Sequence, residues 1–464
     1  MTAALHGGGR LASGNQRLDA ILGGGFPAYA INLVVGPPGS GKTMLAQQYV
    51  FHNASPERPA VYLTTVSEPL EKVLRYGQTM AFFNPAAVGK AVFYEDVGEL
   101  LGTQGLTGVL ERIDALVKER RPGILVVDSF KALSFYAADQ GEFRRFLHSL
   151  SGRLSAFPVT SLWLGEYDRA ALTTAPEFAV ADAIVSLSTE RASQRELRVL
   201  QVLKLRGSGF LSGTHAYRLS AAGIEVFPRL ADPVDPAAYP LPTERISSGI
   251  PALDTMLTDG YWPGAATLVA GPSGAGKTLM GLHFIVSGAR RGEPGIIATL
   301  QENPTQLARV AQGFGWSLAE DGIELLYRSP VDLYIDQWVH ELLAAIERTG
   351  ARRVLIDSLG DLAFAAGDEA RYREYLYSLV QRCSRLGVSL LMTYELPELF
   401  QLVRLSEMGV SHVSDNVVVL QYLRHQSEVR RTLTVLKTRA SLHQPQVREF
   451  TITPEGITLQ AHEG

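Results

Sequence analysis

The chain has 464 residues, of which 46% are hydrophobic and 19% charged, with a formal net charge of −4 and a sequence pI near 6.2. This length exceeds what one hydrophobic core usually supports, so two domains are expected, and the acidic balance argues against a protein that binds nucleic acid mainly through charge. The single cysteine, Cys383, excludes a disulfide framework, and the lack of a signal peptide or apolar span predicts a cytoplasmic protein without membrane contact.

In chain order, short β-rich runs alternate with helical patterns. The runs of the first half are INLVVG (31–36), AVYLTTV (60–66), GILVVDS (123–129), VTSLWLG (159–165), DAIVSLS (182–188) and RVLQVLKL (198–205). Those of the second half are ATLVAG (266–271), GIIATLQ (295–301), RVLIDSL (353–359), VSLLMTY (388–394), NVVVLQY (416–422) and LTVLKTR (433–439). Near-continuous apolar runs indicate strands buried on both faces, as in parallel sheets covered by helices. We therefore predict two three-layer α/β domains.

An internal repeat supports this division. The segment SGNQRLDAILGGGFP near Ser13 returns as SGIPALDTMLTDGYWP near Ser248. Eight residues recur at one fixed offset: Gly14, Leu18, Asp19, Gly25, Gly36, Gly41, Lys42 and Thr43 become Gly249, Leu253, Asp254, Gly260, Gly271, Gly276, Lys277 and Thr278. The period is far longer than that of solenoid repeats, so it indicates a duplicated domain.

The boundary between the two copies is predicted from composition. Residues 231–243, ADPVDPAAYPLPT, contain four prolines and no periodic apolar pattern, which is typical of a stiff, extended linker. We expect an N-terminal domain over residues 1–230 and a C-terminal domain over residues 244–464.

Each half carries a phosphate-binding motif. GPPGSGKT (36–43) and GPSGAGKT (271–278) fit G-x-x-x-x-G-K-[ST], and each stands between a strand-like run and a helical one, as a P-loop requires. Lys42 and Lys277 are predicted to reach the β- and γ-phosphates of ATP, and the hydroxyls of Thr43 and Thr278 to ligate Mg²⁺. The residues predicted to surround the phosphates with backbone amides are Gly36, Gly39, Ser40 and Gly41 in the first loop, and Gly271, Gly274, Ala275 and Gly276 in the second.

Two acids at strand ends are candidate partners of the metal. Asp128 ends the run GILVVD and Asp357 ends the run RVLID. A carboxylate at the carboxyl end of a strand beside a P-loop can hold Mg²⁺ through water. The alternative is an aspartate that caps the segment that follows.

Each half has a candidate water-activating carboxylate between its P-loop and the strand that ends in Asp128 or Asp357. VYLTTVSEP contains Glu68 and IIATLQENP contains Glu302, and either side chain can polarise an attacking water. An exposed glutamate in a turn before proline is the competing hypothesis for both.

With these motifs, the chain resembles the KaiC family of tandem RecA-like P-loop ATPases over nearly its whole length. The segments VLKLRGSGFLSGTHAYRLSAAGIEVFP (202–228) and VLQYLRHQSEVRRTLTVLKTRASLHQPQVREFTITPEGI (419–457) are similar to the ends of the family's two domains. The resemblance implies a hexameric double ring in which a Lys-x-Arg pair reaches the γ-phosphate of the neighbouring subunit. The matching pairs are Lys204 with Arg206 and Lys437 with Arg439. A cation supplied in trans neutralises charge that develops on the transferred phosphoryl group.

The chain also departs from the family pattern. Where the family has two adjacent glutamates, an ungapped match places Val66 and Ser67 in the first half, and Gln301 and Glu302 in the second. A glutamine orients water but cannot accept its proton, so slow hydrolysis is expected in the second domain. The first domain would hydrolyse ATP only if Glu68 moves into place.

The family's autophosphorylation site is only partly matched. Ser411 and His412 occupy the positions of an adjacent Ser and Thr, and the base for that transfer corresponds to the uncharged Gln301. The chain stops at Gly464, without the long C-terminal tail of the clock members. Autokinase activity is therefore in doubt, and a circadian role is not supported by the sequence.

Three functional hypotheses remain open at this stage. The favoured one is an ATP-hydrolysing signalling ATPase that assembles with itself and acts on a protein partner that the sequence does not identify. The second is a Ser/Thr autokinase labelled at Ser411, and the third is an assembly module in which ATP joins subunits without turnover. A recombinase or helicase is disfavoured because the basic clusters at 118–121 and 430–431 are short and mixed with acids.

Overall fold

The computed structural model describes residues 9–66, 69–168, 174–192, 195–230, 239–319, 321–331, 333–396, 412–426, 428–439 and 441–460. The chain divides into two compact units, Met1–Arg229 and Leu230–Gly464. Most of the predicted linker, 231–238, lies outside the described residues. None of the helices described is long and apolar enough to cross a membrane.

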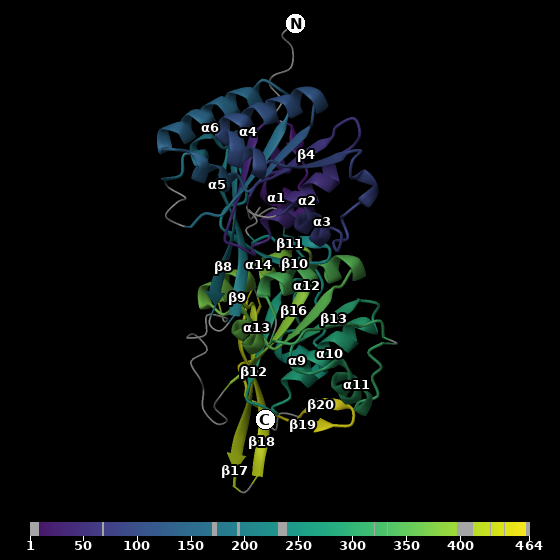
Figure 1. Cartoon of the computed structure of the whole chain (residues 1–464). Coiled ribbons are helices and arrows are strands. Elements are labelled where there is room, and N and C mark those ends of the chain that lie inside the picture. The colour runs from purple at the N-terminus through teal and green to yellow at the C-terminus, as the bar shows by residue number, and fades with distance from the viewer. Residues whose placement is uncertain are drawn as a thin grey trace. The chain divides into compact units, whose positions relative to one another are not determined.

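The first unit alternates strands with helices (Figure 1). Its strands are β1 (Arg10–Leu11), β2 (Phe26–Pro27), β3 (Ile31–Val35), β4 (Ala60–Thr64), β5 (Val92–Asp96), β6 (Ile124–Asp128), β7 (Thr160–Gly165), β8 (Ala183–Ala192), β9 (Arg195–Leu205), β10 (Thr214–Ser220) and β11 (Gly223–Phe227). Its α-helices are α1 (Gln16–Ile21), α2 (Lys42–Asn53), α3 (Leu70–Gly77), α4 (Gly98–Arg120), α5 (Phe130–Leu133), α6 (Gln140–Ser155) and α8 (Glu177–Val180). Nine strands form one sheet in the order β11-β10-β9-β8-β3-β7-β6-β4-β5.

The second unit repeats this architecture. Its strands are β12 (Ala266–Gly271), β13 (Gly295–Thr299), β14 (Glu324–Tyr327), β15 (Arg353–Asp357), β16 (Ser389–Glu395), β17 (Asn416–His425), β18 (Glu428–Thr438), β19 (Arg448–Thr453) and β20 (Gly456–Leu459). Its helices are α9 (Pro251–Met256), α10 (Lys277–Ala289), α11 (Pro304–Gly313), α12 (Ile335–Thr349), α13 (Leu359–Ala366) and α14 (Glu369–Arg385). The sheet order is β20-β19-β18-β17-β12-β16-β15-β13-β14, which matches the order of the first sheet strand for strand.

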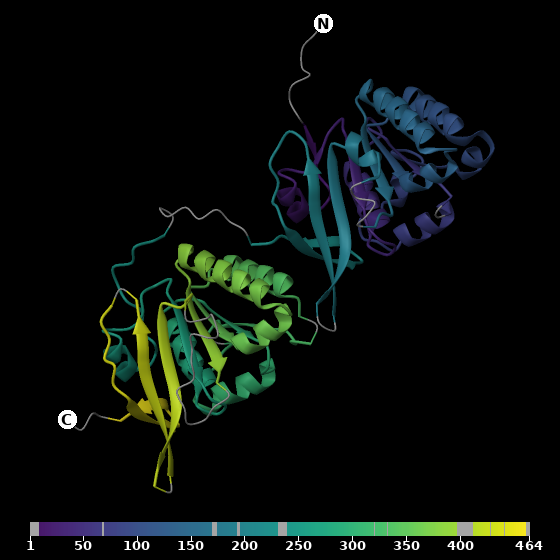
Figure 2. The ribbon, with the colours of Figure 1, turned by 90° about the vertical axis from the view of Figure 1, so that its left-hand side faces the viewer.

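Each sheet has a parallel part and an antiparallel part. In the first unit β8, β3, β7, β6, β4 and β5 run parallel, whereas β9, β10 and β11 continue the sheet as antiparallel hairpins. Figure 2 shows the two long hairpins, β8–β9 in blue-green and β17–β18 in yellow. Every β-rich run predicted from the sequence contains or overlaps a strand of these two sheets. The predicted runs do not include the edge strands β5 and β14, whose residues are mostly half-buried and lack a continuous apolar run. They also do not include the antiparallel strands β10, β11, β19 and β20.

Helices cover both faces of each parallel region. In the first unit the side chains of Leu33 and Val35 pack with α4 and α6, while Val34 between them packs with α1 and α2 on the other face. This alternation follows from the two-residue period of a strand and explains why these strands are apolar throughout. The second unit likewise has two apolar cores, one with α12, α13 and α14 and one with α9, α10 and α11. The predicted fold class, two mostly parallel sheets flanked by helices, is confirmed.

Candidate nucleotide-binding sites

Both P-loops leave the carboxyl end of the strand in the middle of their sheet and enter a helix. Gly39 and Gly41 in the first loop have φ of 73° and 92°, and Gly274 and Gly276 have φ of 72° and 105°. These left-handed values favour glycine. At Gly36, which begins the first loop, a Cβ atom would lie 2.2 Å from a main-chain carbonyl oxygen of β8. The loops are therefore compact turns at the start of α2 and α10, where free backbone amides favour an anion.

The lysine of each motif is held against its own loop. Lys42 Nζ donates hydrogen bonds to the carbonyl oxygens of Gly36 and Pro37, both at 2.9 Å. Lys277 Nζ donates to the Pro272 carbonyl oxygen at 2.9 Å. Both side chains are buried, and burial lowers the pKa of each ammonium group. Each site thus holds a partly desolvated cation where a polyphosphate would lie.

Threonine and aspartate meet beside each loop. Thr43 Oγ1 donates to Asp128 Oδ2 at 2.8 Å, and Thr278 Oγ1 donates to Asp357 Oδ2 at 2.7 Å. Hydroxyl and carboxylate oxygens are the ligand types that Mg²⁺ prefers, so this pair fits the metal of a Mg²⁺–nucleotide complex. The helices that follow, α5 and α13, have serines at their N-cap positions. The two aspartates are therefore not N-caps, and the alternative role considered for them does not apply. The structure therefore brings together the predicted lysine, threonine and acid in both units.

A cavity of about 340 Å³ opens over the second P-loop. Its lining includes Lys277, Thr278 and Asp357 together with Gln301 and Glu302, which follow β13. The two candidate water-orienting residues of the second unit therefore face the same space as the phosphate-binding lysine.

Glu302 is not an exposed turn residue. Its Oε2 atom is buried and has no hydrogen-bond partner among the described residues. Burial, and secondarily the neighbouring carboxylate of Asp357, raises the pKa of Glu302. Its counterpart Glu68 lies outside the described residues, and so does Ser411.

One further carboxylate in each unit lies near the P-loop lysine and was missed by the sequence reasoning. Glu166 Oε1 lies 3.8 Å from Lys42 Nζ, and Glu395 Oε2 lies 3.9 Å from Lys277 Nζ. Glu166 directly follows β7 and Glu395 ends β16, the strand beside the P-loop strand in each sheet. Both glutamates carry the same sequence pattern as Asp128, an acid at the carboxyl end of an apolar strand.

The Lys-x-Arg pair of the first unit lies away from its own P-loop. Arg206 NH1 bonds Asp182 Oδ1 at 3.2 Å, and Asp182 Oδ2 accepts the backbone N–H of Ile31 at 3.0 Å. Lys204 Nζ donates to the carbonyl oxygens of Phe178 and Ala179, at 3.0 and 3.3 Å. Ile31 is the first residue of β3, whereas the P-loop leaves the last. The pair is therefore at the amino edge of the parallel strands, and the P-loop is at the carboxyl edge.

The second unit repeats this arrangement. Arg439 NH1 lies 3.5 Å from Asp415 Oδ1, and the other carboxylate oxygen of Asp415 accepts the N–H of Ala266, the first residue of β12, at 2.9 Å. Lys437 Nζ donates to the Ser414 carbonyl oxygen at 2.7 Å. Burial, together with the adjacent arginine, lowers the pKa of Lys437, as it does for Lys204. Neither pair reaches the P-loop of its own unit.

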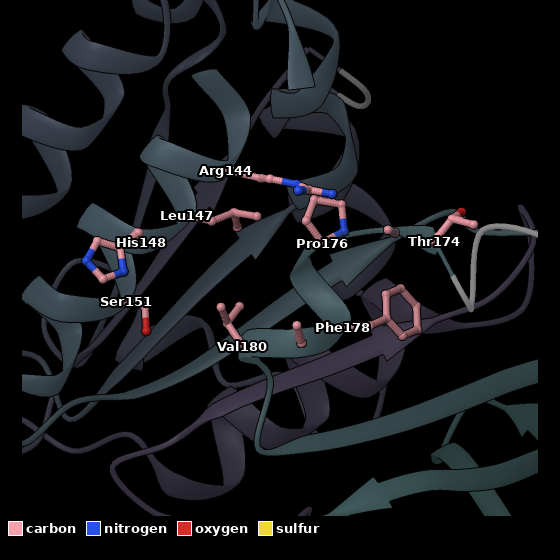
Figure 3. A pocket seen from close by; sticks show the side chains of 10 residues that line it. Arg144, Leu147, His148, Ser151, Thr174, Pro176, Phe178 and Val180 are labelled. Carbon is pink, nitrogen blue, oxygen red and sulfur yellow. The ribbon is translucent and has the colours of Figure 1, made fainter. Parts of the chain in front are cut away.

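A second cavity lies beside the first pair. It measures about 600 Å³ and is lined by residues of α6, including Arg144 and His148, and by residues of the segment around α8, including Phe178 and Val180 (Figure 3). No residue of the P-loop is among those that line it. This hollow belongs to the amino edge of the sheet and is separate from the nucleotide site.

Comparison with known proteins agrees with the repeat. The family model described as "ATPase: KaiC" matches residues 11–231 and again residues 246–464. The circadian clock oscillator protein KaiC of Picosynechococcus sp. is 27% identical over 461 residues, which cover 96% of this chain and 88% of that protein. The protein of the same name from Prochlorococcus marinus is 28% identical over 97% of this chain and 92% of its own length, and circadian clock protein KaiC3 of Synechocystis sp. is 27% identical over 97% and 91%.

The two family matches together cover most of the chain and include both P-loops. They coincide with the two units in which lysine, threonine and aspartate are brought together. The chain therefore belongs to the KaiC family of ATP-binding P-loop ATPases.

Proposed function

We propose that the protein is a slowly ATP-hydrolysing signalling ATPase that binds its nucleotides between the subunits of a ring. The observation that carries this proposal is the same Lys–Thr–Asp arrangement at the P-loop of both units. If one of the two P-loops served only to stabilise the fold, its unit would not need the Thr–Asp pair that fits Mg²⁺, yet both units have that pair.

The residues of each site divide the work between charge and position. Lys42 and Lys277 hold the β- and γ-phosphates with the P-loop amides. Thr43 with Asp128, and Thr278 with Asp357, would hold Mg²⁺, which supplies charge neutralisation at the phosphoryl oxygens when bound. Because the lysines already lie against their loops, little reorganisation is needed when the nucleotide binds.

Slow turnover follows from the residues that face the attacking water. Gln301 lines the cavity over the second P-loop and can accept a hydrogen bond from water without taking its proton. Glu302 can take a proton, but burial, and secondarily the Asp357 carboxylate, raises its pKa and so favours the protonated form. In the first unit Val66 stands where Gln301 stands in the second, so turnover there depends on Glu68.

The position of the Lys-x-Arg pairs supports composite sites. Both pairs lie at the sheet edge opposite their own P-loops. The Arg206 and Arg439 side chains are more than half exposed, which leaves them able to reach another subunit. We propose that each pair completes the site of a neighbouring copy, in a hexameric double ring of the kind that the family resemblance implies.

Two other functions are distinguished by the same assay. The assembly module remains the second candidate, because Gln301 lacks a titratable group and the second site can bind ATP without turnover. Autophosphorylation at Ser411 is the third. A nucleic-acid partner is disfavoured, because Lys118 is paired with Asp114 and Arg430 with Glu428 and Glu449.

The test incubates the full chain with γ-labelled ATP and Mg²⁺ and counts released phosphate and protein-bound label together. Wild type is compared with Lys42→Ala, Lys277→Ala and the double variant. We expect slow phosphate release that the double variant abolishes, and each single variant assigns the release to one unit. Bound ATP with no release would replace this proposal by the assembly module. Label on the protein that Ser411→Ala removes would replace it by the autokinase.

A further inference from the structure

A side-chain network in the second unit fixes the orientation of Gln301. Gln301 Nε2 donates to Asp361 Oδ1 at 3.0 Å, and Ser358 Oγ donates to Asp361 Oδ2 at 2.6 Å. Asp361 lies in the first turn of α13, four residues after Asp357, while Gln301 follows β13. Two segments 60 residues apart in sequence are thus joined at the rim of the nucleotide cavity.

The chemistry of a carboxylate decides which end of the glutamine amide faces it. An ionised carboxylate only accepts hydrogen bonds, so the amide must present its NH₂ group to Asp361. The Ser358 hydroxyl occupies the other carboxylate oxygen. The Gln301 Oε1 atom, which is the acceptor, is therefore left for another donor. Without Asp361 the Gln301 amide could rotate and present its NH₂ group where its Oε1 atom now lies.

We propose that Asp361 is a positioning residue for hydrolysis at the second site, and that it holds Gln301 with its carbonyl oxygen available to the attacking water. This inference rests on the proposed function. In the step, the water oxygen bonds to the γ-phosphorus as the bond from that phosphorus to the β,γ-bridging oxygen breaks. The electron pair of that bond leaves on ADP, and the proton of the water passes to an oxygen of the departing phosphate. Gln301 accepts a hydrogen bond throughout and takes no proton.

The first unit supports the pairing of these two residues. Val66 occupies the place of Gln301, and Ala132, four residues after Asp128, occupies the place of Asp361. Both positions are polar in one unit and both are apolar in the other. If Asp361 only stabilised the start of α13, there would be no reason for the aspartate and the glutamine to be absent from the same unit.

The inference is tested in the Lys42→Ala background of the full chain, where phosphate release reports the second site. We expect Asp361→Ala to lower kcat about fivefold, the equivalent of one ordinary hydrogen bond, and to leave KM nearly unchanged. Asp368→Ala is the matched control, because Asp368 also begins a helix, where its side chain accepts the Arg371 N–H, but it is not among the residues that line the cavity.

A second background separates positioning from folding. Gln301→Glu places a carboxylate beside Asp361, and like charges at hydrogen-bond distance repel. There Asp361→Ala should raise kcat, because the glutamate is released and needs no fixed amide orientation. The predicted sign of the Asp361→Ala effect therefore reverses between glutamine and glutamate at position 301.

Each outcome has one meaning. A fall in kcat in both backgrounds would make Asp361 merely structural, and no change in either would remove it from the site; both overturn the inference and leave the ATPase in place. Release that Lys42→Ala abolishes and Lys277→Ala does not would restrict hydrolysis to the first unit and also overturn it. No release from wild type would overturn the proposed function itself.

Discussion

Replacing His283 by glutamine should change how the second unit responds to acid. His283 lies in α10, is 9% exposed, and its Nε2 accepts the backbone N–H of Ile457 at 2.9 Å. Burial lowers the pKa of His283 to about 4, against a partly opposing hydrogen bond with the Gly249 backbone. Because Nε2 acts as an acceptor, protonation of this ring breaks the hydrogen bond that ties α10 to β20.

The duplicated unit already contains the replacement. Gln48, which stands at the matching place in α2, accepts the N–H of Ile224 at 3.0 Å and donates to the Gly14 carbonyl oxygen at 2.9 Å. Its amide makes the same two kinds of contact and does not titrate. His283→Gln is therefore expected to fold with little change in stability above pH 7.

The magnitude follows from proton linkage. An unfolded histidine titrates near pH 6.5, so between pH 6.5 and 4 the unfolded state binds more protons than the folded one, and stability falls as the pH falls. A pKa of about 4 in the folded state corresponds to a loss of about 2 kcal/mol by pH 5 and about 3 kcal/mol below pH 4. His283→Gln should remove this contribution.

Hydrogen–deuterium exchange of peptides from α10 and β20 at several pH values, compared with peptides from the first unit, measures this. The difference in opening free energy between wild type and His283→Gln should grow as the pH falls from 7 to 5. Gln48→His is the reciprocal control and should transfer the acid sensitivity to the first unit. If both proteins lose stability in parallel over this range, the buried neutral imidazole is not the cause and the reasoning fails.

Three further predictions concern single side chains. Cys383 is fully buried and burial raises its thiol pKa to about 12, so a thiol reagent at pH 8 should label it only after unfolding in urea; rapid labelling of the native protein would contradict the buried position. Gly36→Ala should abolish nucleotide binding at the first site, because its Cβ would lie 2.2 Å from a carbonyl oxygen. Gly39→Ala meets no atom within 4 Å and should cost only about 1 kcal/mol of stability for its left-handed backbone. Nucleotide titration and thermal unfolding measure both variants, and equal losses of affinity and stability in the two would refute this. Thr278→Val should reduce the Mg²⁺ dependence of nucleotide affinity at the second site while Thr278→Ser keeps it, and an unchanged Mg²⁺ titration in the valine variant would count against the threonine as a ligand.

The local parts of each site were predictable because their chemistry is contiguous in sequence. The P-loop residues from Gly36 to Thr43 are adjacent, and Asp128 is marked by the apolar strand that it ends. The approach of Glu166 to Lys42 depends on β7 lying beside the P-loop strand β3, and no local sequence pattern indicates that strand order. The hydrogen bond between Gln301 and Asp361 joins segments separated by two helices and two strands, so no local pattern indicates it.

The Lys-x-Arg pairs show a different limit. The sequence places Lys204 and Arg206 on a late strand, but their distance from the P-loop of the same unit depends on the antiparallel return of β9 along β8. Only the fold shows that the pair and the loop lie at opposite edges of one sheet. That separation is what makes a composite site between two copies a physical expectation.

A subunit-mixing assay tests the proposed composite site most directly. One full-length chain carries Lys42→Ala and Lys277→Ala, and keeps its cation pairs. The other keeps its P-loops and carries alanine in place of all four residues of the pairs, Lys204, Arg206, Lys437 and Arg439. Each chain alone should release little phosphate from ATP, since each lacks one half of every site.

After equal mixing and exchange of subunits, one interface in four should combine an intact P-loop with an intact pair. We predict recovery of about a quarter of wild-type phosphate release, because an arginine supplied in trans restores the rate at each such interface. Full activity of the pair-deficient chain alone, or no recovery in rings shown to contain both chains, would contradict nucleotide sites shared between subunits.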